Sequence, residues 1–140
     1  MIEAKLKWTG GIRFEGTSAF GHTIATDGIK KVGGAENGYK PTELVLYGLA
    51  GCTGVDVVKI LEKMRQEVTG IEIEVKGYQP DEYPKPFNKI EVKYIIRGKN
   101  LDKDKISRAI SLSEEKYCMV SLSLKGVARI TSTFEVIEDK

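Results

Sequence analysis

The chain has 140 residues and a net charge of +2 at neutral pH, with 41% hydrophobic and 30% charged residues. This balance is typical of a folded globular protein, and we expect residues 1–140 to form a single domain. A charge so close to zero gives no electrostatic reason to expect nucleic acid as a partner.

The N-terminal segment MIEAKLKWTG lacks the apolar stretch of a signal peptide, and the apolar run that starts at Leu44 ends in the charged DVVKILEKMR. We expect this run to be too short and too interrupted to span a membrane, and we expect a cytoplasmic protein. Its two cysteines, Cys52 and Cys118, are then kept reduced. They could be two small buried hydrophobic residues, or they could carry thiol chemistry.

Short strands are predicted in the first part of the chain. Residues 2–8 alternate between apolar and charged side chains, which is the pattern of a half-buried strand. Residues 12–18 and 21–26 can continue this strand as a meander. A glycine-rich loop without periodicity follows from Asp27 to Pro41, and loops of this length are often functional.

A long helix is predicted from Pro41 to about Gln66. Proline suits the first turn of a helix, where its missing N–H would be unpaired anyway. The first half of the helix is apolar on nearly all sides and must be surrounded by protein, whereas the second half is amphipathic. Because a chain of this size can hardly wrap such a helix alone, we expect a second copy to cover it, and therefore a homodimer.

Three glycines interrupt this helix at a spacing of three, Gly48, Gly51 and Gly54, with Cys52 among them. A glycine inside a helix costs ~1 kcal/mol relative to alanine, so packing or function must offset them. They leave a stripe with almost no side-chain bulk, which lets another backbone or a substrate approach closely. Close helix packing and a binding site both account for this stripe.

The second half of the chain predicts two alternating strands, IEIEVKGY and NKIEVKYIIRG, paired antiparallel across the proline-bearing QPDEYPKPF. Asp102 is expected to cap a helix from about Lys103 to Lys116, and Cys118 follows that helix. The segment VARITSTFEVIE forms a last strand. This order of elements predicts an α+β fold in which antiparallel strands surround a central helix.

The position of Cys52 limits how its thiol could become reactive. It lies about eleven residues into the helix, too far from the N-terminus for the helix dipole to help, and burial alone makes a thiol inert. A reactive Cys52 therefore needs a cation supplied by the fold. Asp56, one turn on, would oppose a thiolate unless it holds that cation or turns away; a polar residue at a helix contact is the other interpretation. A metal site would need both thiols, His22 and a fourth ligand without any closely spaced pair, and we expect none.

The segments PTELVLYGLAGCTGVDVVKILEKMRQEV and LSEEKYCMVSLSL resemble the superfamily of osmotically inducible protein C and organic hydroperoxide resistance protein (OsmC/Ohr). The shared marks are Pro-x-Glu-Leu before a long helix, Gly-Cys-Thr within it, and Glu-Lys-Tyr-Cys before a short hydrophobic helix. The opening KWTGGIRFEGTSAFGHTIATDG extends the resemblance over essentially the whole chain. The stretch GCTGVDVVKILEKMRQ is more similar to a less characterised branch.

The resemblance implies an OsmC/Ohr-like intertwined homodimer of α+β subunits whose sites are built from both chains. It also implies a thiol-dependent peroxidase that reduces small organic hydroperoxides. Cys52 matches the peroxidatic position, which becomes a sulfenic acid, and Cys118 matches the resolving position, which forms a disulfide with it. A dithiol, lipoyl groups among them, would reduce that disulfide by exchange. The resemblance implies no bound cofactor.

The sequence departs from the family pattern beside the first cysteine. In well-characterised peroxidases of the family an acidic residue ten positions before the cysteine orients an activating arginine. That position is Thr42 here, and the neighbouring Glu43 is the candidate orienter. Arg13, in GGIRF, matches the family's N-terminal arginine and is the candidate activator.

Two other functions remain open from the sequence. One is a non-catalytic dimer that binds an apolar small molecule, with redox-sensitive or structural cysteines, and Thr42 at the acidic position favours it. The other is a metal-binding module that would use His22 and the two thiols. For the peroxidase, the apolar first half of the helix suits an organic hydroperoxide better than hydrogen peroxide.

Overall fold

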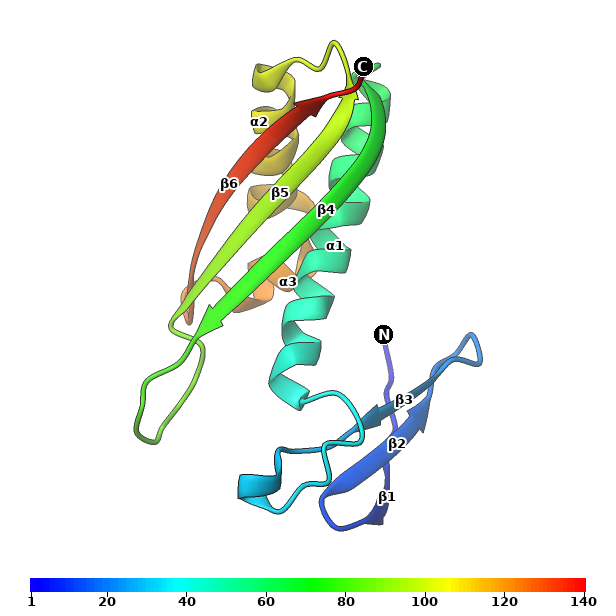
Figure 1. Cartoon of the computed structure of the whole chain (residues 1–140), viewed down its shortest axis with the longest axis vertical. Coiled ribbons are helices and arrows are strands. Elements are labelled where there is room, and N and C mark those ends of the chain that lie inside the picture. Colours follow the sequence, from blue (N-terminus) through cyan, green and yellow to red (C-terminus); the bar gives the residue numbers. More distant parts are fainter. The chain divides into compact units, whose positions relative to one another are not determined.

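The computed structural model describes all 140 residues, which divide into two compact units, Met1–Val45 and Leu46–Lys140. The boundary falls inside the longest helix, α1 (Pro41–Lys63). Each unit contains its own three-stranded sheet (Figure 1). The predicted α+β class is confirmed, and the assignment of residues 1–140 to a single domain stays a prediction.

The first unit contains an antiparallel meander followed by a short 3₁₀ turn: β1 (Lys7–Gly10), β2 (Arg13–Thr17), β3 (Thr23–Thr26) and η1 (Lys30–Val32). The second and third predicted strands are confirmed. The prediction that the first strand starts at residue 2 is wrong. Lys7 pairs with Glu15 in this register and β2 ends at Thr17, so residues 1–4 have no strand opposite them within the chain.

The second unit contains the rest of α1 and six further elements: β4 (Glu67–Tyr78), β5 (Lys89–Lys99), α2 (Lys103–Leu112), the π-helical turn η2 (Ser113–Tyr117), α3 (Met119–Leu124) and β6 (Arg129–Glu138). The antiparallel pairing of β4 with β5 is confirmed. The expectation of antiparallel pairing throughout is wrong for β6, which runs parallel to β5. The helices between these two strands carry the chain back to the starting end of the sheet, and such a crossover is what parallel neighbours require.

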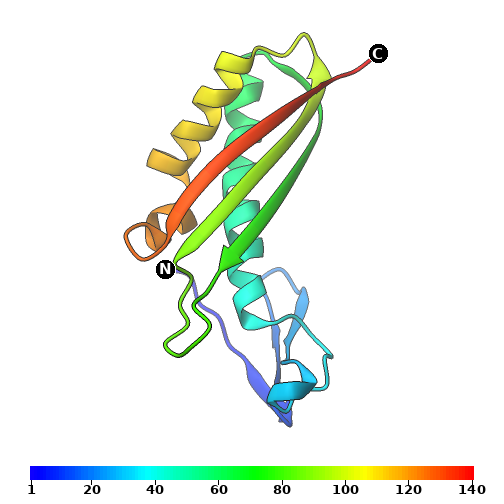
Figure 2. The ribbon, with the colours of Figure 1, turned by 60° about the vertical axis from the view of Figure 1, so that its left-hand side comes forward.

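Helices α1 and α2 cover the same face of the β4-β5-β6 sheet (Figures 1 and 2). Along β5 every second side chain is buried on that face, and the side chains between them are exposed or partly exposed. Every buried hydrophobic side chain of the protein lies in this unit: Leu49, Val57, Leu61, Ile90, Val92, Tyr94, Ile96, Ile106, Ala109, Ile110, Cys118 and Ala128. The core is therefore a single layer between one sheet and the helices on it.

The ends of the two long helices differ from their predicted positions. Helix α1 ends at Lys63 rather than Gln66, because Arg65 adopts a left-handed conformation with φ of 58°. Asp102 caps α2 as predicted, and its side chain accepts bonds from the backbone N–H groups of Asp104 and Lys105. Helix α2 ends at Leu112 rather than Lys116, because the chain widens there into the π-helical turn η2.

Much of α1 lacks cover within one chain. Tyr47, Val55 and Val58 are 60%, 54% and 50% exposed, and nothing lies within 4 Å of a side chain placed at Gly48 or Gly51. By length and composition α1 could also cross a membrane, since its best window has a mean hydropathy of 1.7. The expectation that this run is too short is thus wrong, because its charges gather at the end and leave that window apolar. One such helix is weak evidence, because the central helix of a soluble assembly passes the same test.

Candidate functional site

The two cysteines come together although 66 positions separate them. Cys52 lies in the middle of α1 and is half-buried, whereas Cys118 is fully buried at the N-terminal cap of α3. Both are free thiols, and they lie close enough for Cys52 to help raise the pKa of the Cys118 thiol. The π-helical turn makes this meeting possible, because it ends with the Cys118 N–H bonded to the Ser113 carbonyl at 2.6 Å. Two neighbouring thiols are the starting arrangement that a disulfide requires.

The surroundings of Cys118 oppose its ionisation. Burial, and then the neighbouring Cys52, raise the pKa of the Cys118 thiol to about 11, although the N–H of Ser121 donates to its Sγ at 3.3 Å and favours the thiolate. At neutral pH only about one Cys118 in ten thousand is then ionised. Cys118 therefore needs a proton acceptor before it can attack another sulfur.

A buried polar network lies beside the thiols. Thr53, the residue after Cys52, shares hydrogen bonds of 2.8 Å with Tyr94 of β5 and with Ser113 of η2. Ser113 donates to Asp56, and Tyr94 donates to Glu114. Burial is the main reason why the pKa of Tyr94 is raised. Every buried side-chain polar atom in this region has a partner.

The position of Asp56 answers one question left by the sequence. Its carboxylate accepts the hydroxyl of Ser113 at 3.0 Å, and it takes part in none of the three ion pairs of the structure. Within one chain, Asp56 thus forms a contact between α1 and η2.

Arg13 and Glu43 belong to the first unit and Cys52 to the second. The Arg13 guanidinium pairs with Glu15 at 2.6 Å and donates to the carbonyl of Asn37 at 2.8 Å. Glu43 accepts the backbone N–H of Lys40 at 3.0 Å, which is a helix-capping contact. The roles of Arg13 as activator and Glu43 as orienter of the site therefore stay predictions.

His22 lies outside strands β2 and β3, in the turn between them, and is exposed. Its backbone N–H donates to the hydroxyl of Ser18 at 3.1 Å, which is a local turn contact. No group of three or more His, Cys, Asp or Glu side chains in the chain is arranged to hold a metal ion.

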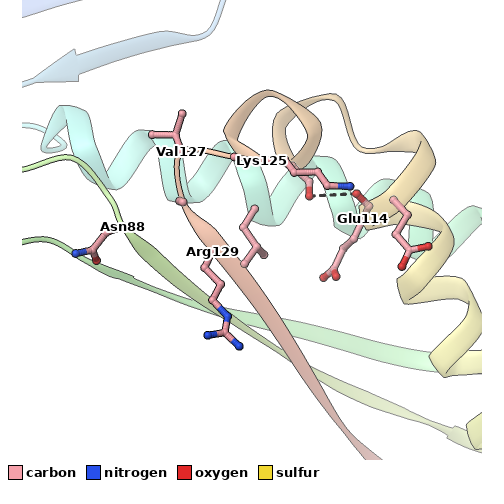
Figure 3. Close-up of a pocket in the computed structure, with 10 residues that line it drawn as sticks. Asn88, Glu114, Lys125, Val127 and Arg129 are labelled. Carbon is pink, nitrogen blue, oxygen red and sulfur yellow. Dashed lines mark hydrogen bonds between the residues drawn. The ribbon is translucent and has the colours of Figure 1, made fainter.

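A cavity of about 580 Å³ opens in the second unit, close to the network (Figure 3). Glu114 and Ser121 line it from the helical side, and Asn88 and Arg129 line it from the strand side. The hydroxyl of Ser121 donates to the Glu114 carbonyl at 3.3 Å. Neither cysteine lines this cavity. The cavity therefore lies beside the thiol pair and does not lead directly to Cys52.

The sequence did not predict the hydroxyl network. Alternation along β5 placed Tyr94 on the inner face, and an inward tyrosine must find a partner for its hydroxyl. The identity of that partner depends on how α1, β5 and η2 pack, which no sequence pattern of this chain records. Thr53 and Ser113 each look like ordinary small residues in the sequence.

These features define a class: an α+β protein with a long glycine-bearing central helix and two convergent thiols. The family model described as OsmC-like protein matches residues 33–133. The chain belongs to this family, and the predicted resemblance is confirmed.

Proteins similar to this chain over nearly their whole length include uncharacterised members of the family. Protein YhfA of Escherichia coli (strain K12) is 38% identical, over 97% of this chain and 98% of its own length. The crystal structure of a hypothetical protein from Aquifex aeolicus VF5 is 32% identical, with a TM-score of 0.88, over 100% of this chain and 98% of that one.

The fold also matches that of an organic hydroperoxide resistance protein, OhrB of Bacillus subtilis. That structure has a TM-score of 0.64 and 23% identity, over 96% of this chain and 98% of that chain. This likeness concerns the fold, and the names of the more similar relatives state no activity.

Proposed function

We propose that this protein is a thiol-dependent peroxidase that reduces organic hydroperoxides. The observation that carries the proposal is the proximity of the two free thiols, which is close enough for Cys52 to help raise the pKa of Cys118. A peroxidatic cysteine needs a partner thiol within reach, because its sulfenic acid is otherwise exposed to further oxidation. The family includes organic hydroperoxide resistance proteins, which agrees with this chemistry.

In the proposed reaction the Cys52 thiolate attacks the terminal oxygen of a hydroperoxide. The O–O bond breaks, the alkoxide takes a proton and leaves as an alcohol, and Cys52 becomes a sulfenic acid. The sulfur of Cys118 then attacks that of Cys52, so that an S–S bond forms and the hydroxyl leaves as water. A dithiol reductant, such as a lipoyl group, restores both thiols by exchange. No bound cofactor enters this cycle.

We infer that the working form is a homodimer in the cytoplasm. The exposed apolar positions of α1, with open space at Gly48 and Gly51, are the surface that a second copy would cover. This surface needs cover because exposing valine and tyrosine side chains and bare backbone along one helix to water costs free energy. The second copy is also the candidate source of a cation for Cys52, with Arg13 as activator and Glu43 as its orienter.

The test counts free thiols before and after one equivalent of cumene hydroperoxide. We expect the parent protein to lose both thiols promptly, Cys52→Ser to lose none, and Cys118→Ser to accumulate a sulfenic acid that dimedone traps. A parent protein that keeps both thiols for minutes would refute the peroxidase.

The second candidate is a non-catalytic dimer that binds an apolar small molecule, with structural or redox-sensitive cysteines. Two observations favour it, the raised pKa of Cys118 and the presence of Thr42 where characterised peroxidases carry an acid. For this candidate we expect an apolar fluorescent probe to bind the parent protein and Cys52→Ser equally, with no thiol consumed.

A further inference from the structure

A hydrogen bond between two hydroxyls joins the segments that carry the two cysteines. Thr53 follows Cys52 directly on α1. Ser113 is the first residue of η2, and Cys118 is the C-terminal cap of that turn. Oγ1 of Thr53 lies 2.8 Å from Oγ of Ser113, and the carbonyl of Ser113 accepts the N–H of Cys118 at 2.6 Å. We call the hydrogen bond between Thr53 and Ser113 the hydroxyl bridge.

The hydroxyl bridge is shielded from water and has a defined direction. Thr53 is 1% exposed and Ser113 is 0% exposed, so water does not compete for either partner. Ser113 donates its one hydrogen to Asp56, which lies 3.0 Å away, and Thr53 is therefore the donor in the bridge. Removing one partner of such a buried bond costs free energy that solvent does not return.

The hydroxyl bridge fixes the turn η2 to the centre of the second unit. Oγ1 of Thr53 is also 2.8 Å from the hydroxyl of Tyr94, a buried residue of β5. Strand β5 is the middle strand of its sheet and is paired on both sides. Asp56, three residues after Thr53, lies on the same face of α1 and contacts Ser113 as well. Ser113 is thus held against one turn of α1, and that turn is held against the middle strand.

The segment that carries Cys118 has little regular structure of its own. The turn η2 spans five residues and α3 spans six, and helices this short are marginal in water without tertiary contacts. Between them the backbone at Cys118 is extended, with φ of −76° and ψ of 104°. Contacts with other elements must therefore determine where the Cys118 sulfur lies. The hydroxyl bridge is a contact of this kind, and it reaches α1 at the residue next to Cys52.

We propose that Thr53 and Ser113 are positioning residues, whose hydroxyl bridge holds the Cys118 turn against α1 and keeps the two sulfurs near the separation at which a disulfide closes. This separation is narrow, because a disulfide needs Cβ atoms ~3.5–4.5 Å apart. Cys52 packs against the buried cluster that contains Cys118, so the two thiols are neighbours already in the reduced protein. The bridge thereby raises the effective concentration of one thiol at the other. Its role in turnover rests on the proposed peroxidase function, whereas its effect on disulfide closure does not.

The first experiment measures disulfide closure without peroxide, in a buffer of oxidised and reduced glutathione. The two protein thiols lose their hydrogens and two electrons to oxidised glutathione, so that an S–S bond forms in the protein and two glutathione thiols are released. We expect Thr53→Val, which keeps the shape and removes the hydroxyl, to lower the equilibrium constant about tenfold, or ~30 mV. A merely structural role would destabilise the oxidised and reduced proteins alike and leave this constant unchanged.

Two further variants serve as the rescue and the control. Thr53→Ser restores the hydroxyl and should recover most of the equilibrium constant. Ser123→Ala removes an exposed hydroxyl of α3, which donates to the Met119 carbonyl at 2.7 Å and does not reach α1, and it should leave the constant unchanged.

Thr53→Val leaves no buried donor without an acceptor, so we expect it to fold. Ser113 keeps Asp56 as its acceptor, and Tyr94 keeps Glu114. Should this variant fail to fold, Ser113→Ala removes the other partner of the hydroxyl bridge and should lower the constant by a similar factor. An unchanged constant in a folded variant without the bridge would overturn the proposal. A parent protein that forms no disulfide in excess oxidised glutathione would overturn it too.

The second experiment follows a single turnover with cumene hydroperoxide. The hydroxyl bridge acts after the sulfenic acid has formed, when the Cys118 sulfur attacks Cys52, the S–S bond forms, and the leaving hydroxyl takes the thiol proton and departs as water. We expect Thr53→Val to form the sulfenic acid at the parent rate and to close the disulfide about tenfold more slowly, so that dimedone traps more of the intermediate. A disulfide step at the parent rate would refute the role in turnover. A parent protein that forms no sulfenic acid would refute the peroxidase, while the glutathione equilibrium still decides the hydroxyl bridge.

Discussion

The two units of the chain are stabilised by different kinds of interaction. The second unit contains every buried hydrophobic side chain, whereas the buried residues of the first are the polar Thr26 and Asp27. Large apolar side chains of the first unit stay exposed, among them Trp8 at 63% and Phe20 at 90%. A sheet of three short strands without a core is marginal in water. The first unit therefore depends on polar contacts and on cover from outside its own sheet.

The largest expected effect is in the core of the second unit. Ile96→Ala removes a side chain with no exposed surface and should lower the free energy of unfolding by about 2–5 kcal/mol. The same substitution in the first unit, at the 42% exposed Ile29, should cost about 1 kcal/mol or less. Urea unfolding followed by circular dichroism measures both. Equal losses would mean that the two units share one core.

The next effect tests the cover of α1. A Cβ at Gly51 meets nothing within 4 Å in a single chain, so Gly51→Ala alone would stabilise the helix. In a dimer that packs on this face, the added methyl group intrudes, and we expect the dissociation constant to rise about tenfold, or ~1.4 kcal/mol. Sedimentation equilibrium measures this, with the exposed Lys103→Ala as control. A more stable protein with unchanged self-association would show that no partner covers Gly51.

The core elements were predictable because their sequence signals are local. Asp102 and the alternation of β5 act within a few residues, and both predictions held. The parallel pairing of β6 was not predictable, because alternation is the same for parallel and antiparallel strands. Residues 1–4 have no partner strand because β2 ends at Thr17, and an alternating sequence pattern does not specify where the partner of a strand ends.

The candidate site was predictable only in part. Physical reasoning identified Cys52 as a thiol in need of a cation, and the resemblance paired it with Cys118. Their proximity depends on the π-helical turn η2, which no propensity scale indicates. The hydroxyl network was missed because Thr53, Tyr94 and Ser113 come from three separate segments whose packing no local pattern encodes.

A smaller effect is expected at the cap of α2, which leads into the turn that holds Cys118. Asp102→Ala removes the acceptor for two backbone N–H groups and should cost about 1 kcal/mol of stability. Asp102→Asn, which also caps well, is the matched control and should stay within a few tenths of the parent. A thermal melt of both variants checks this. A loss as large as that of Ile96→Ala would mean that Asp102 does more than cap the helix.

The smallest effect on global stability is expected from Asp27, although it is the main polar contact of the first unit. Its carboxylate accepts the backbone N–H groups of Gly28, Ala35 and Asn37, at 2.8, 3.2 and 3.1 Å, and so ties the glycine-rich loop to the end of β3. We expect Asp27→Asn to leave the urea midpoint, which reports the core of the second unit, nearly unchanged. The amides of the same three residues should exchange with solvent faster.

The pH dependence of this contact has a definite sign. The backbone N–H groups of Gly28 and Asn37 lower the pKa of Asp27 below its ordinary value of 3.8. Because the folded pKa is the lower one, the stabilisation is present above pH 3.8 and is lost as the pH falls through the folded pKa. Amide exchange in the loop should therefore accelerate in acid in the parent, beyond its intrinsic pH dependence, and show no such change in Asp27→Asn. Protection that persists in acid in the parent would mean that contacts other than this carboxylate hold the loop, and that the first unit is less dependent on polar bonds than its lack of a core implies.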